Sequence, residues 1–281
     1  MDQSPIPLSE YNTFRQYLED ACGIVLGENK HYLVTSRLKR VTEEFSFDSL
    51  SEMMKTLIND NNPRLREKVI DAMTTNETMW FRDVYPFEIL RKNLLPELAE
   101  KKAPIRIWSA ASSTGQEAYS ISMTVSEFQQ QNPGKLISSV EIVGTDISQT
   151  VVNQAQQGAY DELSVVRGLS PERRDKFFTH KDDKWVINPD IKLRTRFTEL
   201  NLLNSYNLLG KFDIIFCRNV LIYFSSEMKK DILERMAKIL KPGGTLILGG
   251  SESPTGYTRE FMMVRYPDGV VYRLKEPIPN V

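Results

Sequence analysis

The sequence predicts an all-helical N-terminal domain followed by an α/β domain with a doubly wound, Rossmann-like parallel sheet. Apolar residues across positions 1–80 recur at helical spacing only. After Lys102, by contrast, strand-like and helix-like segments alternate. In addition, the Pro267-Asp268-Gly269 turn lies between two short apolar segments, which predicts an antiparallel hairpin at the C-terminal edge of the sheet.

Four amphipathic helices are expected in residues 1–80. Each has one apolar face, formed by Tyr11, Phe14 and Leu18; by Val34, Leu38, Val41 and Phe45; by Leu50, Met53, Met54, Leu57 and Ile58; and by Leu65, Val69, Ile70 and Met73. Ser9 and Gly23 are expected to cap the two ends of the first helix. Pro63 suits the first turn of the fourth.

The α/β domain is predicted from four buried strands at residues 105–108, 140–144, 212–217 and 245–248. A helix over residues 226–240 separates the last two, and the hairpin strands are expected at 262–264 and 270–274. Residues 169–200 do not fit this alternation. They are expected to form a small inserted antiparallel β-subdomain with strands at 185–187 and 195–197.

The composition is that of an ordinary globular protein and argues against several classes. Hydrophobic residues make up 41% and charged residues 26% of the 281 residues, and the net charge of −1 predicts no global attraction to nucleic acid or anionic membrane. No segment has the pattern of a signal peptide or a membrane span. Two cysteines and two histidines argue against a disulfide framework or a metal centre, so a cytoplasmic, reducing setting is expected.

The loops that follow the strands are the expected ligand site, because ligands of open α/β sheets lie beyond the carboxyl ends of the strands. Residues 109–115 are small and lead into a helix, which suits close approach of a ligand or simply a tight turn. Asp146 ends the second strand, where a carboxylate can accept hydrogen bonds from ribose hydroxyls; capping of the next helix is the alternative. The glycine pattern of a dinucleotide site is missing, which disfavours a nicotinamide-dependent oxidoreductase.

Two further segments have unusual composition. Arg218 and Asn219 directly follow the buried strand 212–217, with Tyr223 shortly beyond. A charged residue at that point is either a paired surface group or a site residue, and its place at the strand end favours the site. Residues 74–82 crowd five polar residues, two aromatic residues and an arginine between the domains, and a helix cap would explain only the polar ones.

Six segments, taken together and in this order, resemble the chemotaxis receptor protein-glutamate O-methyltransferases. They are T-T-N-E-T-M-W-F-R, W-S-A-A-S-S-T-G-Q-E-A-Y-S, G-T-D-I-S, N-L-L, F-D-I-I-F-C-R-N-V-L-I-Y-F and L-K-P-G-G. The resemblance spans nearly the whole chain and implies methyl transfer from S-adenosylmethionine to receptor glutamates, with release of S-adenosylhomocysteine. It also implies a receptor-docking helical domain over residues 1–80, a linker at about 74–90, and a methyltransferase domain over 91–281 that carries the β-subdomain at about 169–200.

The resemblance implies roles for single residues. S-adenosylmethionine would be bound by residues of the linker and the strand ends, namely Asn76, Thr78, Arg82, Glu117, Asp146, Asn201, Leu202, Arg218 and Asn219. Glu117 would face the methionine ammonium and Asp146 the ribose. Arg82 and Tyr223 would act in catalysis, nearest the transferable methyl group. Gly250 stands where the family often has a histidine, so no role is carried over to it. No metal is implied.

The implied partner is the cytoplasmic signalling domain of methyl-accepting chemotaxis receptors, a helical coiled coil with acidic methylation sites. Lys30, Arg37 and Arg40 lie on one flank of the second predicted helix; a solvated face is the usual explanation, whereas the resemblance favours receptor docking. Some relatives tether a receptor C-terminal pentapeptide on the β-subdomain. Residues 179–184 are short and charged, so no tether is expected. No nucleic acid partner and no membrane insertion are expected either.

Two rival functions remain open on the sequence. A methyltransferase with another acceptor would share the same sheet, because a fold does not name its substrate. An adaptor could bind S-adenosylmethionine and a signalling partner without turnover. The presence of both Arg82 and Tyr223 favours the enzyme over the adaptor.

Overall fold

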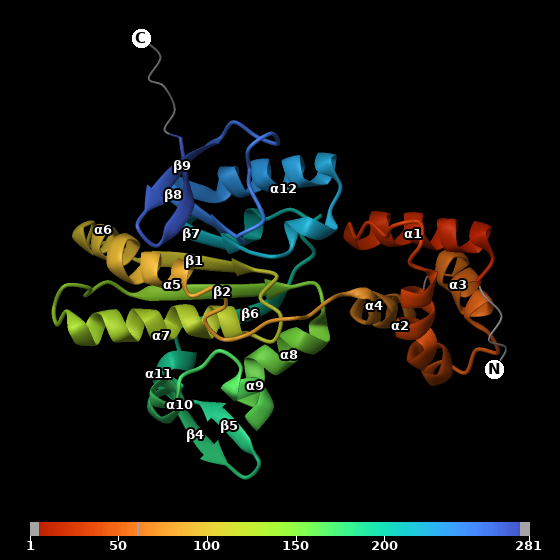
Figure 1. The fold of residues 1–281 in the computed structure, drawn as a ribbon, viewed down its shortest axis with the longest axis horizontal. Coiled ribbons are helices and arrows are strands. Elements are labelled where there is room, and N and C mark those ends of the chain that lie inside the picture. The colour runs from red at the N-terminus through yellow and green to blue at the C-terminus, as the bar shows by residue number, and fades with distance from the viewer. Residues whose placement is uncertain (1–5, 61, 276–281) are drawn as a thin grey trace.

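The computed structural model describes residues 6–60 and 62–275. Its N-terminal part is a four-helix domain that lies beside the α/β domain (Figure 1). The helices are α1 (Leu8–Cys22), α2 (His31–Glu44), α3 (Leu50–Asn59) and α4 (Pro63–Met73). Their predicted apolar faces form one core, to which Phe45 adds from the edge, whereas Ile58 is exposed.

The ends of these helices follow local chemistry. Gly23 ends α1 in the left-handed conformation at φ 80°, as predicted. The predicted Ser9 cap is wrong, because the amide of Tyr11 donates to the carbonyl of Pro7 and the helix therefore begins at Leu8. Pro63 occupies the first turn of α4, where its missing N–H costs nothing.

A seven-stranded mixed sheet forms the centre of the α/β domain, in the order β6-β2-β1-β7-β8-β10-β9. The strands are β1 (Ile105–Ala110), β2 (Val140–Asp146), β6 (Thr195–Glu199), β7 (Phe212–Cys217), β8 (Leu240–Leu248), β9 (Phe261–Tyr266) and β10 (Gly269–Leu274). The first five pair in parallel, and β10 pairs antiparallel with both β8 and β9. The predicted doubly wound sheet with a hairpin at one edge is confirmed.

Helices cover both faces of this sheet. Along β7, Ile214 and Phe216 contribute to one hydrophobic cluster and Ile215 and Cys217 to the other, as the two-residue period of a strand requires. The first cluster packs against α5 (Tyr85–Ile89), η1 (Leu90–Leu94), α6 (Leu95–Glu100), α7 (Gln116–Gln131) and α8 (Gln149–Gln157). The second packs against α12 (Ser226–Ile239), with Tyr206 and η2 (Asn207–Leu209) nearby.

The inserted segment forms the predicted small antiparallel sheet, with two corrections. Its first strand lies before residue 169, where the insertion was predicted to begin, and one predicted strand belongs to the main sheet. The sheet consists of β3 (Ala159–Tyr160), β5 (Lys184–Ile187) and β4 (Phe178–Lys181), flanked by α9 (Glu162–Val166), α10 (Pro171–Phe177) and α11 (Pro189–Lys192). The strand predicted at residues 195–197 does not belong to it. As β6, this strand pairs in parallel with β2 in the main sheet. Only Phe197 of this strand is buried, so its sequence pattern suits the edge of either sheet.

An irregular linker joins the helical and α/β domains. It runs from Thr74 to Val84 without regular helix. The backbone φ is positive at Phe81, Asp83 and Val84, at 49°, 66° and 55°. Non-glycine residues rarely adopt this conformation, and such outliers concentrate at functional sites. In the part of the chain that the structure describes, no helix combines the length and apolarity needed to cross a membrane.

Candidate functional site: an interdomain cavity at the strand ends

A cavity of about 260 Å³ lies between the helical domain, the linker and the C-terminal ends of β1, β2 and β7. Every residue predicted to contact S-adenosylmethionine lines it, as do Tyr223, Lys30 and Arg37. The two domains are hydrogen-bonded beside it. Asn201 Nδ2 donates to the Ala21 carbonyl at 2.8 Å, and the Val25 amide donates to the Tyr223 carbonyl at 2.9 Å. The cavity therefore has walls from both domains.

Asp146 joins the loops that follow β1 and β2. Its Oδ2 accepts from the Ser113 amide at 2.8 Å and its Oδ1 from the Ser148 amide at 3.1 Å. The capping alternative for Asp146 is wrong, because the Ser148 side chain caps α8 through the amide of Val151. Burial raises the pKa of Asp146, although the backbone donors oppose that shift. Each carboxylate oxygen retains a second lone pair for a ligand donor.

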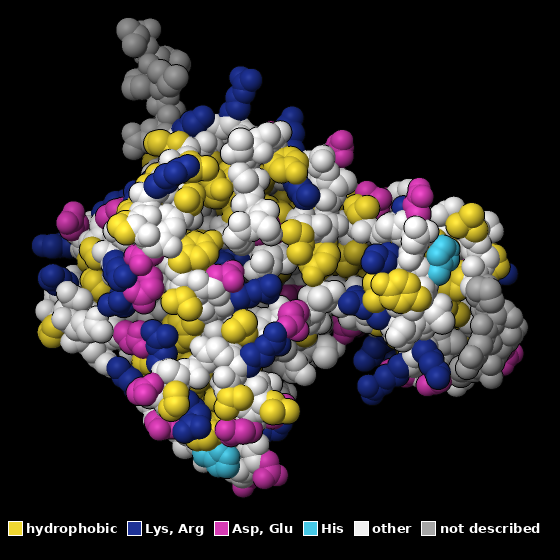
Figure 2. Space-filling model, in the orientation of Figure 1, with side chains coloured by type: hydrophobic (Ala, Val, Ile, Leu, Met, Phe, Trp, Pro, Cys, Tyr) yellow, Lys and Arg dark blue, Asp and Glu magenta, His cyan; other side chains and the backbone are white. Residues whose placement is uncertain are grey.

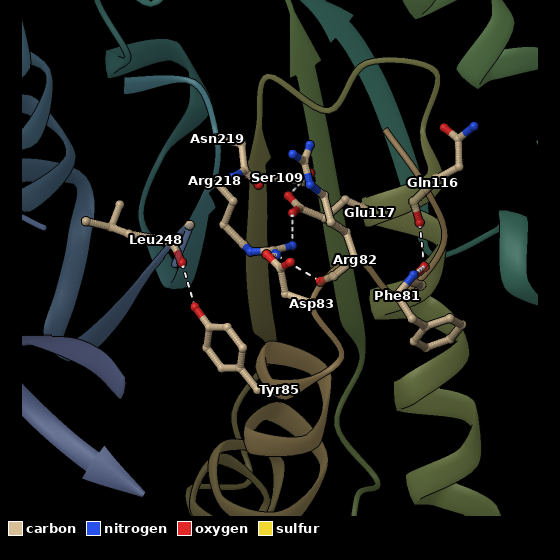
Figure 3. A network of polar contacts seen from close by, with 12 residues as sticks. Phe81, Arg82, Asp83, Tyr85, Ser109, Gln116, Glu117, Arg218, Asn219 and Leu248 are labelled. Carbon is tan, nitrogen blue, oxygen red and sulfur yellow. Dashed lines mark hydrogen bonds and ion pairs between the residues drawn. The ribbon is translucent and has the colours of Figure 1, made fainter. Parts of the chain in front are cut away.

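Arg218 is a buried residue at the centre of an ion-pair network (Figure 3). Only 1% of its side chain is exposed, and its Nη1 donates to Glu117 Oε2 at 3.0 Å. Its Nη2 donates to Asp83 Oδ2 at 2.6 Å and to the Arg82 carbonyl at 2.8 Å. Glu117 also accepts from Ser109 Oγ at 2.8 Å. Arg218 therefore ties the linker to the sheet.

Arg82, in contrast, keeps most of its hydrogen-bonding capacity. Its side chain is half-buried, and its one hydrogen bond within the described residues goes from Nη1 to the Glu77 carbonyl at 3.2 Å. Glu77 itself is ion-paired with Arg167 on the surface. Since a guanidinium carries five N–H donors, Arg82 can still bind a carboxylate with both arms.

The neighbouring aromatic residues explain why residues 80–82 crowd together. Trp80 is fully buried, and its Nε1 donates to the Ser164 carbonyl at 2.9 Å. It packs edge-on against Phe178 of the β-subdomain, with ring centroids 5.2 Å apart. A Cβ on Gly168 would lie 2.2 Å from the Trp80 carbonyl oxygen, so the chain approaches there as only glycine permits. Trp80 thus anchors the linker on the β-subdomain while Arg82 faces the cavity.

The three predicted docking residues lie in different surroundings. Arg37 is committed to the linker, because its Nη1 donates to the Met73 carbonyl at 2.6 Å and its Nη2 to Thr75 Oγ1 at 2.9 Å. Lys30 and Arg40 are exposed. Lys30 lines the cavity, as Arg37 does, but Arg40 does not. Figure 2 shows Lys and Arg side chains gathered on the part of the helical domain nearest the α/β domain.

Glu252 is a site residue that the sequence reasoning missed. It follows β8 and accepts backbone hydrogen bonds from Asn219, Val220 and Gly249. Its place after a parallel strand, at the same edge as Asp146 and Arg218, is the signal that could have revealed it. The ion pair of Asp83 was missed for a different reason, because its partner Arg218 is far away in the sequence.

The cavity suits a ligand rich in hydrogen-bond donors. Two buried oxygens on its wall, Ser112 Oγ and Asn219 Oδ1, have no hydrogen-bond partner among residues 6–60 and 62–275. Unpaired buried acceptors are costly unless a ligand satisfies them. Amino groups and ribose hydroxyls are suitable donors, and the carboxylates of Glu117 and Asp146 favour a cationic ligand with hydroxyls. S-adenosylmethionine has this combination, so the residues present fit it.

Comparison with known proteins agrees with this fit. Residues 76–270 match the family described as CheR methyltransferase, SAM binding domain, and residues 9–74 match CheR methyltransferase, all-alpha domain. A chemotaxis protein methyltransferase of Vibrio parahaemolyticus is 53% identical over 267 residues, covering 95% of this chain and 97% of the relative. One from Pseudomonas aeruginosa is 50% identical over 270 residues, covering 95% and 98%. One from Salmonella typhimurium is 34% identical over 253 residues, covering 88% and 85%.

The fold, the strand-end cavity and these matches define an S-adenosylmethionine-dependent methyltransferase. More particularly, the chain belongs to the CheR family of chemotaxis protein methyltransferases.

Proposed function

We propose that the protein transfers a methyl group from S-adenosylmethionine to glutamate side chains of methyl-accepting chemotaxis receptors, forming glutamate methyl esters and S-adenosylhomocysteine. The observation that carries the proposal is the contrast between two arginines at one cavity. Arg218 makes three hydrogen bonds to protein partners and ion pairs with two carboxylates, whereas Arg82 makes one hydrogen bond and lines the same cavity as Tyr223. A planar fork of donors is matched to a carboxylate acceptor.

The donor would be held by both walls of the cavity. Asp146 and the unpaired Asn219 Oδ1 would accept from its hydroxyl and amino groups, and Glu117 would balance its ammonium charge. Asn76, Thr78, Asn201 and Leu202 would complete the enclosure. When bound, S-adenosylmethionine supplies a methyl group on a sulfonium whose departure leaves a neutral thioether.

The acceptor needs no general base. A glutamate side chain has an ordinary pKa of about 4.3, so it is already the anionic nucleophile at pH 7. Neither His31 nor His180 lines the cavity. The residues of the chain therefore have to orient the carboxylate and exclude water from it. We assign the orientation to Arg82, with Tyr223 lining the same cavity from the 3₁₀ turn η3 (Leu221–Tyr223).

The receptor would dock its cytoplasmic signalling domain against α2. Lys30 and Arg40 are exposed there and can meet acidic methylation sites, whereas Arg37 supports the linker behind them. The β-subdomain offers no long loop for a receptor tail, because β4 ends at Lys181 and β5 begins at Lys184. We therefore propose docking without a C-terminal pentapeptide tether. Nanomolar binding of such a pentapeptide would contradict this part of the proposal.

The direct experiment is methyl transfer from labelled S-adenosylmethionine to a panel of receptor signalling domains. We expect label on receptor glutamates that mild base releases, since base hydrolyses esters. Label on a base-stable linkage would point to another acceptor chemistry. Binding of S-adenosylmethionine without release of S-adenosylhomocysteine, for every receptor in the panel, would favour the adaptor.

A further inference from the structure

Glu252 uses one buried carboxylate to close the ends of two neighbouring strands. Its residue exposure is 9%. Oε2 accepts from the Asn219 amide at 2.7 Å and from the Gly249 amide at 2.8 Å, and Oε1 accepts from the Val220 amide at 3.0 Å. The β7–β8 ladder ends with the pairing of Cys217 and Leu248, so these three amides lie just beyond it. The carboxylate continues the connection between the strands where the ladder stops.

Three converging amide donors require a carboxylate at this position. An ionised carboxylate has two oxygens with about four acceptor sites and no donor. Glutamine would keep one acceptor oxygen and would turn an NH₂ group toward at least one of the amides. A buried carboxylate is itself tolerated only when it is hydrogen-bonded, which these amides achieve.

These hydrogen bonds fix the conformation of Asn219. Its φ is 58°, in the left-handed region that asparagine tolerates better than most residues. A Cβ on Gly249 would lie 2.8 Å from Asn219 Nδ2, so the amide packs against the bare glycine backbone. Asn219 Oδ1 is left buried and unpaired, on a residue that lines the cavity. The second amide bound by Glu252, that of Val220, begins the turn that carries Tyr223.

We infer that Glu252 is a positioning residue for the donor site, which holds the carbonyl group of the Asn219 side chain in place to receive a donor group of the adenosine-containing ligand. Glu252 does not line the cavity, so it acts through Asn219. The inference rests on the donor half of the proposed function and is independent of which acceptor is methylated.

The test measures S-adenosylhomocysteine binding by calorimetry in a set of full-length variants. Glu252→Gln is expected to weaken binding about tenfold, the scale of a displaced hydrogen bond at a buried site. Asn219→Gly removes the side chain while tolerating the left-handed backbone, and it is expected to weaken binding by a similar factor. The double variant should bind within about twofold of Asn219→Gly alone, because Glu252 acts through Asn219. Glu260→Gln, an exposed glutamate in the following segment, is the matched control and should bind like the unaltered protein.

Binding of Glu252→Gln within twofold of the unaltered protein would overturn the inference. Losses that multiply in the double variant would overturn it too, because the two residues would then act separately. If the unaltered protein failed to bind S-adenosylhomocysteine, the donor site itself would fall and the inference with it. If the variants bound S-adenosylhomocysteine as expected but no receptor were methylated, only the proposed acceptor would be wrong.

A measurement on the unaltered protein keeps the inference falsifiable if Glu252→Gln does not fold. The Asn219 amide donates to Glu252, so its hydrogen exchange in the ligand-free protein should be strongly protected although it lies in a loop. Exchange as fast as that of an exposed loop amide would overturn the inference.

Discussion

The two sides of the cavity differ in how completely their charges are paired. On the strand-end side, Arg218 and Glu117 are bound to each other and to further partners. On the linker side, Arg82 makes a single backbone contact in the part of the chain that the structure describes. The two arginines line the same cavity but differ in the number of N–H donors that protein partners use, and this difference is why we propose Arg82 as the residue that binds the acceptor carboxylate.

The largest effect is expected on the free energy of unfolding, at the buried Arg218. Arg218→Ala leaves Glu117 and Asp83 without their buried counter-ion and should lower the free energy of unfolding by about 3 kcal/mol. Denaturant unfolding measures this directly. Lys230→Ala, at an exposed pair with Glu234, is the control and should leave the transition nearly unchanged. Equal effects of the two changes would contradict the assignment of Arg218 as a core ion pair.

Loss of the free arginine should affect turnover more than stability. We expect Arg82→Ala to lower the rate of receptor methylation by about 10² or more at saturating donor, the scale of a lost orienting contact. Arg82→Lys keeps the charge but loses the planar guanidinium, so its methylation rate should lie between those of the unaltered protein and Arg82→Ala. Steady-state rates with unchanged thermal unfolding would sharpen the comparison. Near-normal turnover of Arg82→Ala would remove Arg82 from the catalytic residues.

Asp146 tests the strand-end side by ligand binding. Asp146→Asn should weaken S-adenosylhomocysteine binding about tenfold, through one charged hydrogen bond. Burial raises the pKa of Asp146, so the folded protein holds this proton more tightly than the unfolded chain does. Protonation of Asp146 therefore favours folding as the pH falls. The same protonation removes a carboxylate acceptor, so ligand binding should weaken as the pH is lowered, and the weakening should begin at a pH above the ordinary pKa of about 3.9. Titration calorimetry should find this pH dependence in the unaltered protein and a weaker one in Asp146→Asn.

The smallest effect is expected at the docking surface. Arg40→Glu should slow receptor methylation roughly fivefold at low salt and much less at high salt, because exposed charges are screened. Lys135→Glu makes the same charge change on an exposed residue of the α/β domain and is the matched control. Arg37→Glu should also reduce stability, since Arg37 is hydrogen-bonded to the linker. If reversing both Arg37 and Arg40 left methylation unchanged at moderate salt, the docking surface would lie elsewhere.

Local periodicity was enough to predict most of the fold. The helices, the parallel strands and the edge hairpin follow from apolar spacing and turn residues, which act within a few positions of one another. The assignment of Thr195 to Phe197 failed because a short strand with one buried residue carries no information about its partner strand. The partner is decided by tertiary packing.

For the site, the sequence predicted the residues that line the cavity but not the residues that hold them in place. Motif positions gathered the cavity-lining residues, because parallel strands bring their ends to one edge. The roles of Glu252 and Asp83 could not be predicted, since each hydrogen-bonds to a segment distant in the sequence. The commitment of Arg37 to the linker could not be predicted either, because it depends on the packing of α2 against α4.

The close approach of Gly168 to Trp80 limits how members of this family can be recombined. Because a Cβ on Gly168 would lie 2.2 Å from the carbonyl oxygen of Trp80, the β-subdomain and the linker that carries Arg82 are in close backbone contact there. A chimaera that exchanges only the small sheet should therefore keep Gly168 and Trp80 from the same parent. If Gly168 and Trp80 came from different parents, the linker would pack against an unmatched β-subdomain. Methyl transfer would then be disturbed at a site distant from the exchanged part.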